Sequence, residues 1–282
     1  SAADPEAWSS VGRRLSLAMR RYLSELHAGR VDPQQFGMRY DADLRSGFDA
    51  DSLLRSALAD ERLTEAVRSA APAWPEYHAL RRVLARYRQL VDDPAWQKNL
   101  PPLPGGKLSP GQPYGALALL QQRLLLLGDL ATADSKLPER YQGALVDAVK
   151  AFQARHAIAP DGVIGRESFE QLNITPAARV RQIGLAMERL RWMPPPQGAR
   201  AIVVNVPEFM LHGYDMGAGI VDTRVAMKVI VGTARKTPTP VFDAEMRFIE
   251  FSPYWNVPPS IARSETLPRL RRDPGYFDRQ GF

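Results

Sequence analysis

"ALVDAVKAFQARHAIAPDGVIGRESFEQLN", residues 144–173, holds two helical patterns joined by a short polar turn. Mostly apolar residues recur in its first half at spacings of four, three and four: Leu145, Val149, Phe152 and His156. Such spacing is typical of one face of an α-helix. In the turn, Asp161 can accept hydrogen bonds from backbone N–H groups, and Gly162 can take a left-handed conformation. A helix, a turn and a further helix are therefore predicted, with Phe169 and Leu172 facing the core.

The residues before this stretch predict one more helix of the same unit. Its apolar face is formed by Leu117, Leu120, Leu124 and Leu127. Gly128 follows directly and is expected to end the helix. Residues 114–173 are therefore predicted to form a compact three-helix unit.

This unit resembles the peptidoglycan-binding domain found in many cell-wall enzymes, a small three-helix module. The family's marks are a Leu-Gln pair with a following Leu and Gly, an Ala-Val run with Phe-Gln and His, and an Asp-Gly-x-Ile-Gly turn. They are carried here by Leu120, Gln121, Leu124, Gly128, Ala148, Val149, Phe152, Gln153, His156, Asp161, Gly162, Val163, Ile164 and Gly165. We expect the apolar members to lie in the core and His156 to be packed or capping rather than a ligand.

DNA is a less favoured partner of the three-helix unit than peptidoglycan. A helix-turn-helix DNA binder is disfavoured, because "LVDAVKAFQARH" offers few basic or amide side chains on one face for groove readout. The net charge of +6 comes from arginines spread along the whole chain, which is typical of a solvated surface. No nucleic-acid partner is therefore expected, and contacts to glycan or stem peptides are expected from exposed polar residues.

Residues 1–98 predict a helical scaffold. One apolar pattern consists of Val11, Leu15, Ala18, Met19, Tyr22 and Leu26, and a second consists of Tyr77, Leu80, Leu84, Tyr87 and Val91. Gly29 is expected to end the first helix, and Asp51 to cap a helix that carries Leu54 and Leu58. No polar cluster there suggests chemistry, so a support role is predicted. Residues 99–113, rich in Pro and Gly, are predicted to be a linker without regular structure.

The bulk composition is that of a globular protein of about two domains: 282 residues, 45% hydrophobic and 24% charged. No apolar run is long enough to span a bilayer, and "SAADPEAWSS" lacks the pattern of a signal peptide. Cysteine is absent, which removes disulfides, thiolate metal sites and cysteine nucleophiles from these 282 residues.

Residues 174–198 predict a connecting helix that packs with the scaffold through Val180, Ile183, Met187 and Leu190. After residue 198, the spacing of apolar residues changes from the helical pattern to the alternating pattern of strands. Four strands are then predicted, at 201–206, 209–214, 223–232 and 246–251, in an antiparallel or mixed sheet. In the first of them, Ile202, Val204 and Val206 share one face. The fold class is therefore α+β and multidomain.

Residues 199–282 resemble the N-terminal part of an L,D-transpeptidase catalytic domain, as in the large periplasmic enzymes of Gram-negative bacteria. The resemblance is carried by "MERLRWMP" before the sheet, Asn205 to Pro207, Met227 to Gly232, Thr237 to Pro240 and Pro253 to Ala262. It implies a cysteine nucleophile in a Ser-His-Gly-Cys-x-Arg motif, which is expected after Phe282. It also implies cross-links between two diaminopimelate residues of peptidoglycan stems, made without a metal or organic cofactor. His212 is not expected to substitute for the missing groups.

The resemblance also implies where substrate binds. Tyr254, Trp255 and Asn256 could line the cleft that binds the donor stem. Alternatively, Trp255 packs between the sheet and the insertion that follows, which is the commoner role of a large aromatic residue beside proline. Arg263 could attract stem-peptide carboxylates, although a solvated basic face is the commoner meaning of such a run. Residues 260–282 would open the insertion that covers the active site.

The expected partners are the stem peptides and glycan of peptidoglycan, together with other cell-wall synthesis proteins. The expected location is the periplasm, with attachment to the inner membrane through a segment outside this chain. The 282 residues alone are expected to be inactive. The alternative is a non-catalytic peptidoglycan-binding scaffold protein whose catalytic region has degenerated.

Overall fold

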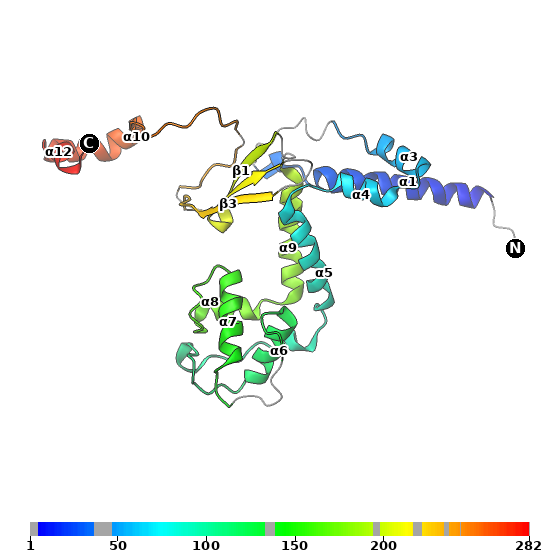
Figure 1. Ribbon diagram of the computed structural model, residues 1–282, viewed down its shortest axis with the longest axis horizontal. Coiled ribbons are helices and arrows are strands. Elements are labelled where there is room, and N and C mark those ends of the chain that lie inside the picture. The colour runs from blue at the N-terminus through cyan, green and yellow to red at the C-terminus, as the bar shows by residue number, and fades with distance from the viewer. Residues whose placement is uncertain are drawn as a thin grey trace. The chain divides into compact units, whose positions relative to one another are not determined.

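The structure is a computed structural model that describes residues 5–36, 47–132, 139–193, 198–216, 222–233, 237–242 and 244–281. The chain divides into two compact units, residues 1–242 and 243–282. Figure 1 shows the helices of the first unit followed by its strands and then the short helices of the second. The α+β, multidomain prediction is confirmed.

Among the described residues, four α-helices belong to the scaffold: α1 (Pro5–Ala28), α3 (Ala50–Ala59), α4 (Leu63–Ala70) and α5 (Pro75–Gln89). Helix α1 ends where predicted, because Gly29 takes a left-handed conformation with φ +82°. The predicted cap of α3 is wrong by two residues. Asp49 lies at the N-cap, and its Oδ1 accepts from the N–H groups of Asp51 and Ser52, both at 3.0 Å. Asp51 lies within the first turn, where its backbone donates.

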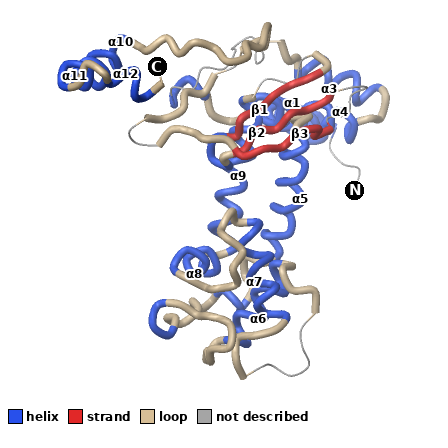
Figure 2. The backbone as a smooth tube through the Cα atoms, turned by 60° about the vertical axis from the view of Figure 1, so that its left-hand side comes forward, coloured by secondary structure: helices blue, strands red, loops and turns tan. Residues whose placement is uncertain are grey.

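The scaffold shares its core with the connecting helix and the sheet. Helix α9 (Pro176–Trp192) contacts α5 along its length, and the two run side by side in Figure 2. The buried cluster consists of Leu23, Leu26, Ala50, Leu54, Ala70, Trp74, Tyr77, Ile183, Met187 and Tyr214. Burial of these side chains is the main driving force that joins α9 to the helices before residue 90.

The apolar pattern of α1 is buried only in its C-terminal half. Leu23 is fully buried and Leu26 nearly so, whereas Val11, Leu15 and Tyr22 are 54%, 68% and 49% exposed. Residues 11–18 are all exposed. Helical spacing therefore predicted the helix correctly, but it did not show that the first turns lie outside the core.

The three-helix unit consists of α6 (Leu117–Leu127), α7 (Ala144–Arg155) and α8 (Arg166–Asn173). Gly128 ends α6 in a left-handed conformation, as predicted. The predicted core residues Leu120, Leu124 and Val149 are fully buried, and Leu145, Phe152 and Leu172 are each 1% exposed. The module therefore has a closed core of its own.

Residues 99–113 are largely irregular, as predicted, apart from a 3₁₀ turn at Pro104–Gly106. They do not behave as a free linker, however. Leu100 and Leu108 are 3% and 0% exposed and belong to the core of the three-helix module. Leu108 also exchanges two backbone hydrogen bonds of 3.0 Å with Ile164. The segment is thus part of the packed module, because its two leucines supply core surface between the prolines and glycines.

Three strands form an antiparallel sheet in the order β1 (Arg200–Asn205), β2 (Met210–Asp215) and β3 (Asp222–Lys228). Val203 lies opposite His212, and Leu211 lies opposite Met227. Tyr214 and Val203 face the scaffold core. The predicted apolar face of β1 is the exposed one: Ile202 and Val204 are 53% and 44% exposed. Val206 lies in a 3₁₀ turn after the strand.

The prediction of a fourth strand at 246–251 is wrong, and the third strand ends at Lys228 rather than Gly232. Residues 246–251 are irregular, with Phe248 and Phe251 79% and 87% exposed. A strand with bulky residues on both faces needs neighbours on both. The second unit offers no strand for pairing among its described residues, 244–281.

The second unit is a set of short helices: α10 (Pro259–Ile261), a π-helical turn (Ala262–Thr266), α11 (Leu267–Arg272) and α12 (Tyr276–Gln280). Arg269 donates to the Tyr276 hydroxyl at 3.0 Å, and Arg279 pairs with Asp273. These contacts link α11 to α12 within the unit.

Candidate functional site

The signature turn of the module, Asp161 to Gly165, is built around the side chain of Gln153. The Gln153 Nε2 lies within hydrogen-bond distance of Asp161 Oδ1 at 3.0 Å and of the Val163 carbonyl at 2.9 Å. Its Oε1 accepts from the Gly162 N–H at 2.9 Å. Gln153 is 1% exposed, so these partners satisfy a buried amide that would otherwise be costly. The Phe-Gln pair of the signature therefore fixes the turn.

Gly162 is required by both conformation and space. Its φ is +76°, and a Cβ there would lie 2.8 Å from Val146 Cγ1 and 3.1 Å from Lys150 Cε. The buried hydroxyl of Tyr141 donates to the Gly162 carbonyl at 2.7 Å, and burial raises the pKa of that hydroxyl. As predicted, Asp161 accepts from a nearby backbone group, the Val163 N–H, at 2.8 Å.

The Leu-Gln pair of the signature is also internal. Leu120 is fully buried, and Gln121 is 8% exposed. The Gln121 Oε1 has no hydrogen-bond partner among the described residues. The signature thus describes the fold of the module, and its buried members do not form a ligand-contacting surface.

His156 is a packed and capping histidine, as predicted. Its ring packs against Phe152 in a tilted arrangement with centroids 4.0 Å apart, and Nδ1 lies 2.8 Å from the Phe152 carbonyl. That contact requires the proton on Nδ1, which leaves Nε2 to accept from Arg179 at 3.3 Å. Burial and then the nearby Arg155 and Arg179 lower the pKa of His156 to about 4, although its bond to Phe152 raises it. The ring is therefore neutral near pH 7 and its two nitrogens are occupied.

Arg123 on α6 is a buried cation that the sequence alone did not single out. It is fully buried, yet it has four hydrogen bonds: to the carbonyls of Ala95, Lys98 and Leu172 at 3.0, 2.6 and 2.8 Å, and to Asn173 Oδ1 at 3.0 Å. Its guanidinium also lies over the ring of Trp96 at 5.6 Å. Arg123 therefore ties the segment that enters the module to the end of α8.

The module is attached to α5 and α9 by further arginines. Arg86 on α5 donates to the Leu126 carbonyl at 2.7 Å. Arg179 on α9 donates to Gln171 Oε1 at 2.6 Å. Arg179 therefore holds α9 at its module end. Within the module, Arg155 on α7 forms a bidentate pair with Asp129 in the loop after α6, both bonds 2.6 Å.

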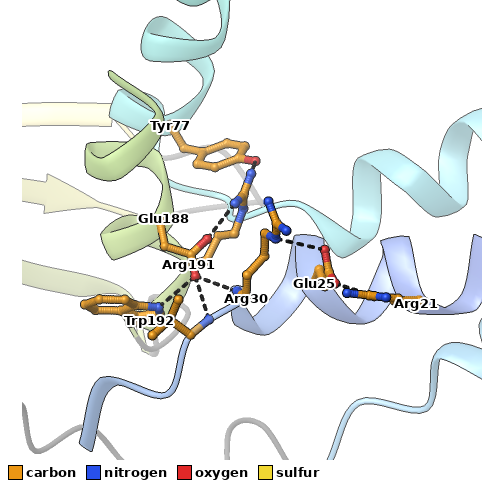
Figure 3. Close-up of polar contacts among 8 residues, drawn as sticks. Arg21, Glu25, Arg30, Tyr77, Glu188, Arg191 and Trp192 are labelled. Atoms are coloured by element: carbon orange, nitrogen blue, oxygen red, sulfur yellow. Dashed lines mark hydrogen bonds and ion pairs between the residues drawn. The ribbon is translucent and has the colours of Figure 1, made fainter. Parts of the chain in front are cut away.

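At the scaffold end, α9 is held by Glu188, a role that its sequence position does not reveal (Figure 3). Glu188 Oε1 accepts from the backbone N–H groups of Arg30 and Val31 at 2.5 and 3.0 Å and from Trp192 Nε1 at 3.2 Å. Its Oε2 accepts from Arg191 at 2.9 Å. Burial alone would raise the pKa of Glu188, but these donors hold it below its ordinary value.

Gly29 makes this approach possible. A Cβ at residue 29 would lie 2.6 Å from Glu188 Oε1 and 2.7 Å from Trp192 Nε1. The left-handed glycine that ends α1 therefore also opens the space in which α9 meets the scaffold, a role that the sequence does not reveal.

The sheet is attached to the scaffold through Tyr214. This residue is 3% exposed, its ring packs edge-on against Trp74 at 5.7 Å, and its hydroxyl donates to Glu76. Burial and then the Glu76 carboxylate raise the pKa of the Tyr214 hydroxyl. On the same strand, His212 lies 3.0 Å from Glu208, and its ring packs against that of Tyr214 with centroids 6.1 Å apart.

The predicted substrate residues lie in the second unit. Tyr254, Trp255 and Asn256 are in an irregular segment, with Tyr254 94% and Trp255 59% exposed. Arg263 is exposed on the helical turn that follows. These side chains are exposed within their unit, and their contact with substrate stays a prediction.

The remaining histidines are also explained by their surroundings. His27 stacks on Phe48 at 4.1 Å, and His78 lies beside Tyr77 on α5. The described residues contain no group of three or more acidic, histidine or cysteine side chains suited to a metal ion. Nor do they include a helix with the length and apolar character needed to cross a membrane.

Comparisons with known proteins find matches for three segments of the chain. Residues 1–84 match a family described as a scaffold domain, and residues 114–172 match a "Putative peptidoglycan binding domain". Residues 199–282 match the L,D-transpeptidase catalytic domain. A curated protein of Haemophilus influenzae named "Putative L,D-transpeptidase" is 32% identical over 98 residues.

That alignment covers 35% of this chain and 19% of the Haemophilus influenzae protein. The chain therefore resembles a transferase-type family of cell-wall enzymes, and the predicted resemblance is confirmed for all three segments.

Proposed function

We propose that the protein acts as a peptidoglycan L,D-transpeptidase in the periplasm. The observation that carries the proposal is the presence, in one chain, of a peptidoglycan-binding match at 114–172 and an L,D-transpeptidase catalytic match at 199–282. The structure supports this pairing, since α9 is fixed to the module by Arg179 and to the scaffold by Glu188. Helix α9 thereby joins the module to the scaffold, against which the sheet packs through Tyr214.

The proposed reaction is acyl transfer between two stem peptides. A cysteine thiol loses its proton and attacks the carbonyl of diaminopimelate in a tetrapeptide stem. A thioester forms, the amide bond to D-alanine breaks, and the proton passes to the amine of the departing D-alanine. The amine of a second diaminopimelate then attacks the thioester, which forms an amide and regenerates the thiol. The attacking sulfur is not supplied by residues 1–282, which contain no cysteine. We place it in sequence after Phe282.

Tyr254, Trp255, Asn256 and Arg263 are proposed to contact the donor stem. Tyr254, Trp255 and Asn256 are exposed in the segment before α10, and Arg263 is exposed on the π-helical turn after it, which is compatible with that role. An arginine can hold a stem carboxylate through two parallel N–H···O hydrogen bonds. An asparagine amide can donate to a backbone carbonyl and accept from a backbone N–H of the stem peptide.

The function is tested with protein that continues past Phe282, incubated with disaccharide tetrapeptides, and with the 282-residue chain as its matched control. Mass spectrometry of the products is expected to show free D-alanine and a dimer lighter than two substrates by one D-alanine. The control is expected to leave the substrate unchanged. Absence of both products with the longer protein would contradict the proposal and favour a non-catalytic wall-binding scaffold.

Wall binding is tested separately, by sedimentation of the 282-residue chain with purified sacculi. Weak binding is expected, and Phe152→Ala, which opens the module core, is expected to reduce it. Ile202→Ala on the exposed sheet face serves as the control, because that side chain is 53% exposed and outside the module. Equal recovery with and without sacculi would argue against a wall-binding role.

A further inference from the structure

Between residues 11 and 22, helix α1 presents an apolar stripe that the scaffold core does not cover. Val11, Leu15, Ala18 and Tyr22 follow one another at spacings of four, three and four, so they share one helix face. All four are exposed; Leu15 is 68% and Val11 54% exposed. The stripe extends about 17 Å along the helix, at 1.5 Å per residue. A row of this length is unlike the scattered single apolar residues that are normal on protein surfaces.

The same part of α1 is strongly basic. Residues 10–24, "SVGRRLSLAMRRYLS", contain four arginines and no acidic residue. Arg14 follows Val11 by three positions, and Arg21 follows Ala18 by three, so both arginines border the stripe along one edge.

The arginines of α1 are available to an external anion. Arg20 and Arg21 pair with Asp51 and Glu25, but Arg20, Asp51 and Arg21 are largely exposed, and such surface pairs contribute little. Arg13 and Arg14 have no ion-pair partner within the described part of the chain. A helix with an apolar face bordered by arginines is typical of segments that lie in a membrane interface.

We propose that α1 lies on an anionic membrane surface, with Val11, Leu15 and Tyr22 inserted among the acyl chains and Arg14 and Arg21 at the level of the headgroups. The charge of the arginines favours a membrane over a second copy of the chain as the surface that covers the stripe. Two stripes packed against each other would bring like-charged arginines together, whereas an anionic bilayer attracts each of them. Tyr22 suits the boundary, since its ring is apolar and its hydroxyl is polar. The proposal is independent of the enzymatic activity proposed above.

Flotation of the 282-residue chain with lipid vesicles tests this inference. Binding is expected with vesicles of phosphatidylglycerol and phosphatidylethanolamine, to weaken as salt is added, and to be much weaker with phosphatidylcholine alone. Leu15→Glu is expected to reduce the partition coefficient about tenfold or more, because it removes an inserted leucine and adds a negative charge. Arg14→Gln is expected to reduce it about fivefold.

Two matched variants on α9 serve as controls. Leu185 is 65% exposed, close to the 68% of Leu15, and Arg189 is an exposed helical arginine like Arg14. Leu185→Glu and Arg189→Gln are therefore expected to leave vesicle binding unchanged. Circular dichroism should show native helix content in all four variants, since each replaces an exposed side chain.

Three results would overturn the proposal: equal binding to neutral and anionic vesicles, no loss in Leu15→Glu, or the same loss in Leu185→Glu. Light scattering supplies a further check on the same protein samples. A concentration-dependent dimer that Leu15→Glu abolishes would assign the stripe to self-association and would likewise overturn the membrane assignment.

Discussion

The three-helix module and the three-stranded sheet are both rich in apolar residues, but the module buries them within a closed core, whereas the sheet buries those on one face and exposes those on the other. Every apolar helix face of the module meets another, and Leu120, Leu124 and Val149 are fully buried. The sheet buries Tyr214 on one side and leaves Ile202 and Val225 about half exposed on the other. The difference follows from contact range. Helices of one module pack against neighbours close in sequence, whereas a sheet covered on both faces depends on distant segments.

The largest expected effect compares a core residue of the module with a residue of the exposed sheet face. Phe152→Ala should lower the free energy of unfolding by about 3–5 kcal/mol, because it leaves a cavity in a closed core. Val204→Ala should change it by no more than about 0.5 kcal/mol. Thermal and urea unfolding would measure both. Similar losses in the two variants would break the contrast between a closed module and a half-covered sheet.

A second pair of variants separates backbone strain from crowding within the module. Gly162→Val should destabilise it by roughly 1–3 kcal/mol from the left-handed conformation alone, with a further loss from contact with Val146. Gly105→Val has a left-handed φ of +60° but open space around its Cβ, so only the strain is expected. Melting temperatures should fall in both, and further in Gly162→Val. An unchanged midpoint for Gly162→Val would show that the turn is not held as described.

A third test compares His156 of the module with His212 of the sheet. The pKa of His156 is about 4 in the folded chain, below the ordinary value of 6.5, because burial and nearby arginines oppose its charge. The unfolded chain therefore binds this proton first, and stability is lost as pH falls from about 6.5 to about 4.

His156→Gln should remove about 1–2 kcal/mol of this pH dependence, less than the full linkage value because the ring is partly exposed to solvent. His212→Gln serves as the control on the sheet. Urea midpoints at a series of pH values would measure the slopes, and parallel curves for the wild-type chain and His156→Gln would count against the assignment.

The smallest expected effect is the absence of covalent modification by a carbapenem. The sheet lies in the segment that matches a catalytic domain, yet the 282 residues hold no cysteine and no described histidine paired with a serine or threonine. Incubation with a carbapenem should therefore leave the intact mass unchanged, since no activated nucleophile is present. A stable increase by one drug molecule would reveal a nucleophile in these residues and change the interpretation of the sheet.

Local pattern accounts for most of the helical fold. The spacing of Leu145, Val149 and Phe152, together with Gly128 and Gly162, predicted the helices and turns of the module, because these signals act within a few residues. Strand 246–251 was predicted by the same kind of signal and is absent, because pairing depends on a partner that the pattern itself cannot supply.

Buried polar residues were the least predictable. Arg123 and Glu188 looked like ordinary solvated charges, since arginine and glutamate are usually exposed. Their partners are backbone groups from distant segments: the Ala95 and Lys98 carbonyls for Arg123, and the Arg30 N–H for Glu188. Backbone groups carry no sequence signal. The substrate role of Tyr254 to Asn256 remains a prediction from resemblance.

The packing of residues 95–113 bears on how the module can be cut from the chain. A fragment that begins at Tyr114 would lose Leu100 and Leu108 from its core, together with two carbonyl acceptors of Arg123 on α6 and the two backbone hydrogen bonds between Leu108 and Ile164. Arg123 would then be a desolvated cation without two of its carbonyl acceptors. For expression of a stable isolated module, the first residue should therefore precede Pro94, so that the short 3₁₀ turn with Trp96 and the whole proline-rich segment are retained.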